Sequence, residues 1–230
     1  MKSVLSQEAK EILATIFKDR IRTNLLRNLE QKTLISLVQI VPSWIKPDML
    51  TFIGFLGSLT TLSSFILATY VNRNYLLLGV LGFAINWFGD SLDGRLAYFR
   101  KNPKKWYGFS LDLLSDWLSV ILIGLGYMIY SEEKWDLAGF GFVVLYGWAM
   151  IIAVIRYLVT GKYTIDAGLF GPTEIRIIIS AVMVLEIFFI GIIQYSAVII
   201  SLILLIVNIS DTVKLLQLGH ERDLAEKEKS

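Results

Sequence analysis

The stretch that decides the fold reads DSLDGRLAYFR at residues 90–100 and GFSLDLLSD at residues 108–116. It sets four aspartates in apolar sequence: Asp90, Asp93, Asp112 and Asp116. Because successive helical residues are about 100° apart, the first two share one helix face and the last two share a face of the next helix. A short hairpin between the two helices then brings all four carboxylates to one pocket.

Several like charges in one pocket are favourable only where cations lie between them. Clustered oxygen ligands suit Mg²⁺ or Mn²⁺, which also bind phosphate oxygens. Gly94 and Ala97 lie on the same helix face and leave room for a flat base or a diphosphate. The pattern therefore predicts a metal site of Asp90, Asp93, Asp112 and Asp116 beside a phosphate-containing ligand. A cation or proton transporter would also cluster intramembrane acids, but it does not explain the two small residues.

The rest of the chain reads as a membrane protein. Of its 230 residues, 55% are apolar and only 18% are charged, which is too little polar surface for a soluble domain of this size. The absence of cysteine excludes disulfides and thiolate metal sites. The sequence predicts an all-α integral membrane fold with six transmembrane helices, at residues 50–71, 76–98, 108–130, 137–158, 174–192 and 195–214.

Basic residues gather on one side of these spans, in the connections near residues 100–105 and 156–176 and in the N-terminal segment. The positive-inside rule then places both termini and the acidic pocket in the cytoplasm. We expect three parts: a cytoplasmic or interfacial segment at 1–46, a catalytic domain at 47–216 and a charged tail at 217–230. Within the first part, residues 4–33 predict an amphipathic helix in the membrane interface or, alternatively, a helix packed on a partner.

The acidic stretch resembles the signature of the CDP-alcohol phosphotransferases (CDP-alcohol phosphatidyltransferases), D-x-x-D-G-x-x-A-R-x8-G-x3-D-x3-D. Seven of its eight fixed positions are present. Tyr98 stands where the family has arginine, and one extra residue precedes Gly108. Arg100, on nearly the same helix face as Asp93, is our candidate for the missing charge.

The resemblance implies a metal-dependent enzyme that transfers a phospho-alcohol or phosphatidyl group from a CDP-linked donor to an acceptor hydroxyl and releases CMP. It implies that Asp90, Asp93 and Asp112 hold two Mg²⁺ or Mn²⁺ ions, while Asp116, in the same cluster, acts as general base. It also implies a homodimer in the membrane, with no nucleic-acid partner. A family member that has lost catalysis and serves as a scaffold is a further alternative.

Residues 47–54, PDMLTFIG, are similar to the opening of the first span in several branches of that family. By this resemblance Asp48 and Thr51 close over the nucleotide, although Asp48 after Pro47 also suits a helix N-cap. The predicted site for the CDP moiety is Asp48, Thr51, Gly94, Ala97, Arg100 and Gly108.

Arg156, Lys162 and Arg176 flank the second large cytoplasmic connection, and a helix-start pattern at residues 171–174 precedes Arg176. This region resembles the phosphatidylinositol-phosphate synthase branch, which binds a phosphorylated acceptor. That resemblance favours CDP-diacylglycerol as donor and a phosphorylated polyol as acceptor. Two alternatives stay open: a choline- or ethanolamine-type phosphotransferase with a lipid acceptor, and cations that only contact lipid headgroups.

Overall fold

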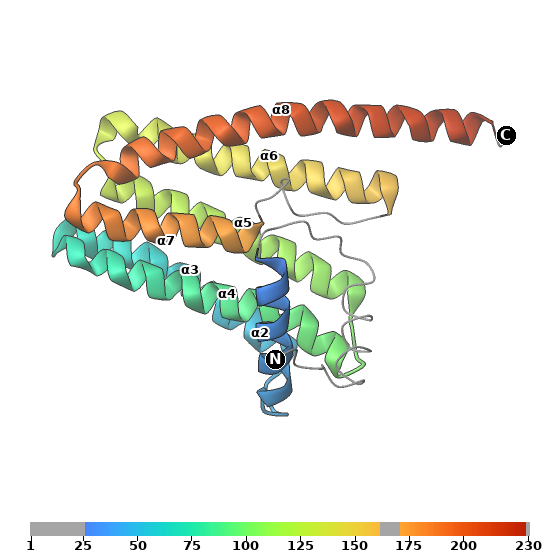
Figure 1. The fold of residues 1–230 in the computed structure, drawn as a ribbon, viewed down its shortest axis with the longest axis horizontal. Helices are drawn as coiled ribbons and strands as arrows, with labels where there is room; N and C mark the ends of the chain where they lie inside the picture. Colours follow the sequence, from blue (N-terminus) through green and yellow to red (C-terminus); the bar gives the residue numbers. More distant parts are fainter. Residues whose placement is uncertain (1–25, 162–170, 229–230) are drawn as a thin grey trace.

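The computed structural model describes residues 26–161 and 171–228, and all regular elements in these ranges are helices (Figure 1). They are α2 (Arg27–Ile40), α3 (Pro47–Tyr70), α4 (Leu76–Phe99), α5 (Lys105–Tyr130), α6 (Asp136–Thr160), α7 (Pro172–Phe188) and α8 (Ile192–Lys227), with short 3₁₀ turns η1 (Arg73–Tyr75) and η2 (Glu133–Trp135). The prediction of an all-α fold is confirmed.

Within the described ranges, five helical segments are long and apolar enough to cross a membrane. They are Pro47–Tyr70, Arg73–Phe99, Lys105–Tyr130, Glu133–Thr160 and Ile192–Lys227. The chain is therefore a multi-pass membrane protein. The predicted fifth span, residues 174–192, coincides with α7, which has 17 residues and is not among the five.

The charged tail predicted at residues 217–230 is helical where the structure describes it. Helix α8 continues past residue 216 to Lys227, where Arg222 pairs with Glu226 one turn later at 2.8 Å. The same Arg222 donates to the carbonyl of Leu158 at the end of α6, which satisfies one of that helix's last acceptors. The amphipathic helix predicted over residues 4–33 lies mostly outside the described residues; the described α2 starts at Arg27 and ends at Ile40.

Helices α3 and α4 pack with their backbones almost in contact. A Cβ atom on Gly89 would lie 2.3 Å from the backbone nitrogen of Gly54, and one on Gly57 would lie 2.4 Å from that of Asn86. Small residues permit this approach, as is common between membrane helices. The close contact fixes the register of α3 against α4, which carries the first two aspartates of the acidic stretch.

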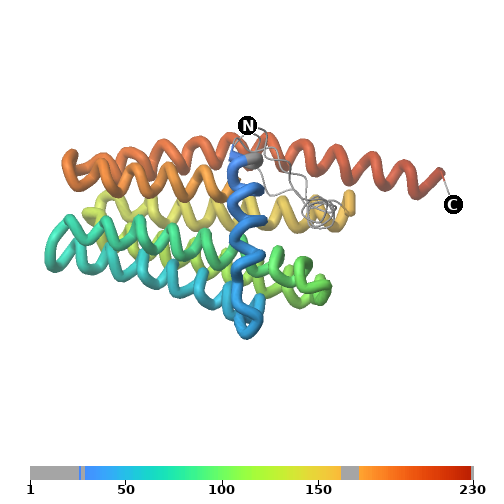
Figure 2. The backbone as a smooth tube through the Cα atoms, turned by 60° about the horizontal axis from the view of Figure 1, so that its bottom comes forward, coloured from blue at the N-terminus to red at the C-terminus, as the bar shows by residue number. Residues whose placement is uncertain are grey.

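Helix α2 crosses the bundle at a steep angle, in contrast to the other helices, which run side by side (Figures 1 and 2). Its apolar face is buried: Leu34 and Val38 pack with Leu50 of α3 and with Leu92 and Leu96 of α4. Helix α2 thus rests on the half of α4 that follows Asp90.

Candidate active site

Three of the four predicted metal ligands come together at one point of the bundle. Asp90 of α4 and Asp112 and Asp116 of α5 each offer a carboxylate oxygen within 4.8 Å of the other two. Asp112 and Asp116 are one turn apart on α5, so both face α4 as the helical spacing predicts. All three are half-buried.

The fourth aspartate, Asp93, lies outside this group of three and is more deeply buried. Its Oδ2 accepts a 2.6 Å hydrogen bond from the Thr51 hydroxyl of α3. Asp93 and Asp112 line one cavity together. Asp112 therefore belongs both to the group of three and to the cavity, and three of the four carboxylates are within the spacing of a common ion.

Arg176 of α7 supplies a positive charge at the cluster. Its Nη2 donates to Oδ2 of Asp90 at 2.7 Å, and both side chains are largely buried. Asp116 and the Tyr146 hydroxyl of α6 are also within electrostatic reach of this guanidinium. Residues of α4, α5, α6 and α7 thus meet at the cluster, and Arg176 is a cation held against its carboxylates.

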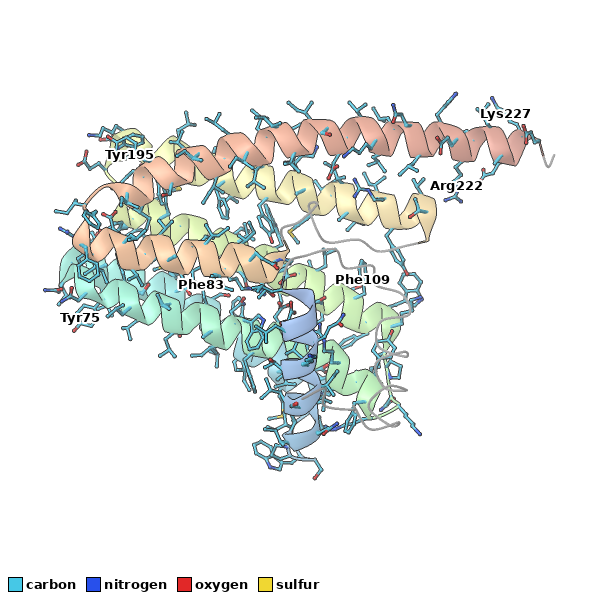
Figure 3. All side chains as sticks on the ribbon, viewed as in Figure 1. Tyr75, Phe83, Phe109, Tyr195, Arg222 and Lys227 are labelled. Atoms are coloured by element: carbon cyan, nitrogen blue, oxygen red, sulfur yellow. The ribbon has the colours of Figure 1, made fainter. Side chains whose placement is uncertain are left out.

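A cavity of about 450 Å³ opens beside the cluster, between α3, α4 and the first turns of α5. Phe109 lines this cavity, and in Figure 3 it lies away from the end of the bundle that carries Tyr75 and Tyr195. The cavity is lined by all six residues predicted for the CDP moiety: Asp48, Thr51, Gly94, Ala97, Arg100 and Gly108.

Cations and aromatic rings that sequence reasoning did not single out also line this cavity: Lys46, Lys104, Lys105, Trp106, Tyr107, Phe109 and Tyr157. The Tyr107 hydroxyl donates to Oδ2 of Asp48 at 3.3 Å, and the Phe109 and Tyr157 rings are 5.7 Å apart. Ammonium groups with aromatic faces suit a ligand that combines phosphates with a planar base. The signal was present as the run KKWY before Gly108.

Arg100, the candidate for the charge missing at Tyr98, also binds backbone carbonyl groups in the turn before α3. Its guanidinium donates to the carbonyl oxygens of Ile45 and Pro42, the latter at 2.8 Å. Arg100 thereby ties the end of α4 to the turn that precedes α3, while both Arg100 and Tyr98 line the cavity.

The three predicted acceptor residues have different surroundings. Arg176 lies at the carboxylate cluster, where it pairs with Asp90. Arg156 of α6 pairs with Asp211 of α8 at 3.6 Å and does not line the cavity. Lys162 lies outside the described residues.

The donor set fits a divalent cation that prefers oxygen. Asp90, Asp112 and Asp116 offer hard carboxylate oxygens close enough to share an ion, and the chain has no cysteine to favour a softer metal. Such a cation next to a basic, aromatic cavity is an arrangement for chemistry on phosphate groups.

Comparison with known proteins agrees with this geometry. The sequence model described as CDP-alcohol phosphatidyltransferase matches residues 44–208, which is well over half of the chain and includes α3 to α7. A comparison with curated proteins found no match.

Proposed function

The chain belongs to the CDP-alcohol phosphatidyltransferase family, and from that membership we propose that it transfers a phosphatidyl group from CDP-diacylglycerol to a phosphorylated polyol. The family establishes a metal-dependent membrane transferase of phospholipid synthesis, which uses a CDP-linked donor and releases CMP. The donor lipid, the phosphorylated acceptor and the likeness to the phosphatidylinositol-phosphate synthase branch are our proposal.

The observation that carries the proposal is Arg176 beside the carboxylate cluster. Its Nη2 is 2.7 Å from Asp90, while the cavity with the lysines and aromatic rings lies on the other side, at Asp93 and Asp112. A guanidinium has five N–H donors, so it can contact Asp90 and an acceptor phosphate together. Donor and phosphorylated acceptor would then approach the cluster from two directions.

In the proposed reaction, Asp116 takes the proton from the acceptor hydroxyl as its oxygen attacks the phosphorus that carries the diacylglycerol. The new O–P bond forms as the bond from that phosphorus to the bridging diphosphate oxygen breaks, and CMP leaves with the electron pair. Asp90, Asp93 and Asp112 would hold Mg²⁺ or Mn²⁺, with Asp116 at the same site. When bound, two ions neutralise the diphosphate and stabilise the leaving CMP.

Within the cavity, we assign the CDP moiety to Asp48, Thr51, Gly94, Ala97, Arg100 and Gly108. Lys104 and Lys105 would face the diphosphate and Tyr107 the base, since phosphate attracts ammonium groups and a base stacks on an aromatic ring. Arg156 and Lys162 would extend the acceptor side beyond Arg176.

We further propose that α7 is a sixth span. The Trp135 and Tyr195 rings are 5.2 Å apart, so the turn after α7 lies at the same end of the bundle as the α5–α6 connection. The start of α7 lies at the opposite end, beside α2 and α4. Helix α7 rises about 25 Å, and its following turn adds the remaining reach.

Six spans would place both termini on the side of the active site, and the basic residues of the α4–α5 hairpin favour the cytoplasm for that side. The steep crossing of α2 supports an interfacial position for the segment 1–46, next to the catalytic domain 47–216 and the charged tail 217–230. We also expect a homodimer in the membrane.

The test is CMP release by the purified protein in lipid, with Mg²⁺ or Mn²⁺, in which CDP-diacylglycerol and CDP-amino-alcohols are each combined with candidate acceptors. Asp116→Asn should abolish release, and Asp136→Asn, at the far end of the bundle, is the matched control. Release only with CDP-diacylglycerol and a phosphorylated polyol, lost with a chelator, is the expected result. Release only with a CDP-amino-alcohol and a lipid acceptor would overturn the substrate assignment.

A further inference from the structure

Helix α2 carries a buried carboxylate that the proposed chemistry does not use. Glu30 is 5% exposed, and it precedes residues 44–208, which the family model matches. A buried carboxylate is costly unless it is paired. Two helices contribute partners to Glu30: Nη2 of Arg95 on α4 lies 3.7 Å from Glu30 Oε1, and the Thr173 hydroxyl of α7 donates to Oε2 at 3.2 Å.

A second carboxylate makes the reverse connection. Glu174 of α7 accepts from the backbone N–H of Leu26, just before α2, at 2.9 Å and from that of Gly171 at 3.0 Å. Helix α2 therefore contributes an acid to the start of α7, and α7 contributes an acid to the start of α2. The two helix starts are held in one register by the polar contacts of two buried glutamates.

The contacts of Glu30 are close in sequence to the two residues that meet at the carboxylate cluster. Arg95 is five residues after Asp90 on α4, and Thr173 is three residues before Arg176 on α7. A shift of α7 relative to α4 would change the 2.7 Å pair of Asp90 and Arg176. Small misplacements of positioning groups have large kinetic effects in transfer reactions.

We propose that Glu30 is a positioning residue: through Arg95 and Thr173 it fixes α7 against α4, and so places Arg176 for the acceptor. The effect of Glu30 on acceptor affinity rests on the proposed function, whereas its effect on the position of α7 is independent of the substrates. Because no described residue of α7 lines the donor cavity, a change at Glu30 should affect the acceptor more than the donor.

The kinetics of Glu30→Gln and of the double variant Glu30→Leu/Arg95→Met test the role of Glu30. Breaking a buried ion pair on one side destabilises a protein, but replacing both partners by apolar residues often restores stability. We expect Glu30→Gln to raise the acceptor KM about tenfold and to leave the donor KM within about twofold. The double variant should have a melting temperature close to that of the parent protein, but it should keep the raised acceptor KM.

A distance measurement tests the placement without turnover. The chain has no cysteine, so Leu81→Cys on α4 and Ile177→Cys on α7, both exposed, can carry one spin label each. We expect one narrow distance in the parent background and a broader or shifted distribution after Glu30→Gln. An unchanged distribution would overturn the proposal, even if the proposed substrates are wrong. A double variant with the parent acceptor KM would also overturn it, because Glu30 would then serve stability alone.

Discussion

The Thr51 hydroxyl of α3 donates a 2.6 Å hydrogen bond to Oδ2 of Asp93 on α4, and both residues are buried. The bond crosses the tightest helix contact in the site, where Gly54 of α3 faces the backbone of Gly89. Asp93 lines the cavity, and its other oxygen, Oδ1, accepts from the backbone N–H of Gly94, so the Thr51 bond and this contact together fix the orientation of the carboxylate. Thr51 thus acts on the acidic site through Asp93.

Replacing Thr51 by valine should therefore impair the site more than replacing it by serine. Valine keeps the shape but leaves the buried carboxylate oxygen without this donor, at a cost of about 1–3 kcal/mol. Serine keeps the hydroxyl. We expect Thr51→Val to lower kcat/KM for the CDP donor by at least about tenfold, with Thr51→Ser close to the parent, in a CMP-release assay. Equal activity of the two variants would show that the hydroxyl does not matter.

Gly108 and Gly89 offer a matched pair of alanine substitutions. A Cβ on Gly108 has no atom within 4 Å, whereas one on Gly89 would lie 2.3 Å from the backbone of α3. We expect Gly89→Ala to lower the melting temperature and Gly108→Ala to leave it unchanged. If the CDP donor approaches the α5 backbone at Gly108, its KM should rise in the stable Gly108→Ala variant. A parent-like KM would remove Gly108 from the donor site.

Local spacing allowed the main elements to be predicted from sequence. The apolar runs and their breaks locate α3 to α6 within a few residues, and the four-residue spacing of Asp112 and Asp116 places both beside Asp90. Helix α7 ends at Phe188, before the predicted end of the fifth span at residue 192, because Phe189 leaves the helix and Gly191, with φ of 96°, precedes the next helix. The sequence predicts the break at residues 193–194, a few residues late, because a continuous apolar run does not fix where the chain turns.

Contacts between residues far apart in sequence could not be predicted in the same way. The hydrogen bond that holds Asp93 comes from Thr51, which is 42 positions away. Pairing of Glu30 with Arg95 depends on the steep crossing of α2, and no periodicity within α2 encodes that angle. Helical spacing predicts which residues share a face, but the packing of other helices decides which of them meet.

Arg176 should govern the acceptor rather than the donor. A hydrogen bond to a charged group contributes about 1.5–3 kcal/mol, so Arg176→Ala should raise the acceptor KM roughly tenfold to a hundredfold. Arg176→Lys keeps the charge but loses the forked geometry and should recover only part of the affinity. Arg73→Ala, in the turn at the opposite end, is the control. An unchanged acceptor KM in Arg176→Ala would exclude Arg176 from the acceptor site.

Glu186 should matter for folding but not for catalysis. It is fully buried at the end of α7 and accepts from the backbone N–H groups of Gly191 and Ile193 and from the Tyr130 hydroxyl, all at 2.9–3.1 Å. Glu186→Ala leaves these donors unsatisfied and should lower the stability by about 2 kcal/mol or more. Tyr130→Phe removes one of the partners and should cost less. Thermal unfolding measures both, and CMP release per folded molecule should stay at the parent level.

The proposed topology predicts which positions a membrane-impermeant thiol reagent can reach in the cysteine-free chain. Asn102→Cys in the α4–α5 hairpin should react only from the cytoplasmic side, because this connection holds the basic residues. Glu133→Cys, in the α5–α6 connection, and Ile190→Cys, after α7, should react only from the opposite side; all three positions are exposed.

Ile190→Cys is the decisive position, because it separates six spans from five. If α7 does not cross the bilayer, the turn that contains Ile190 is not on the same side as Glu133, and the two labels would appear on different sides. The 5.2 Å contact of Trp135 with Tyr195 makes that outcome physically difficult, since the rings follow the two turns directly. Reaction of Glu133→Cys and Ile190→Cys only from the non-cytoplasmic side would establish α7 as the sixth span. Reaction of Asn102→Cys only from the cytoplasmic side would place the active site in the cytoplasm.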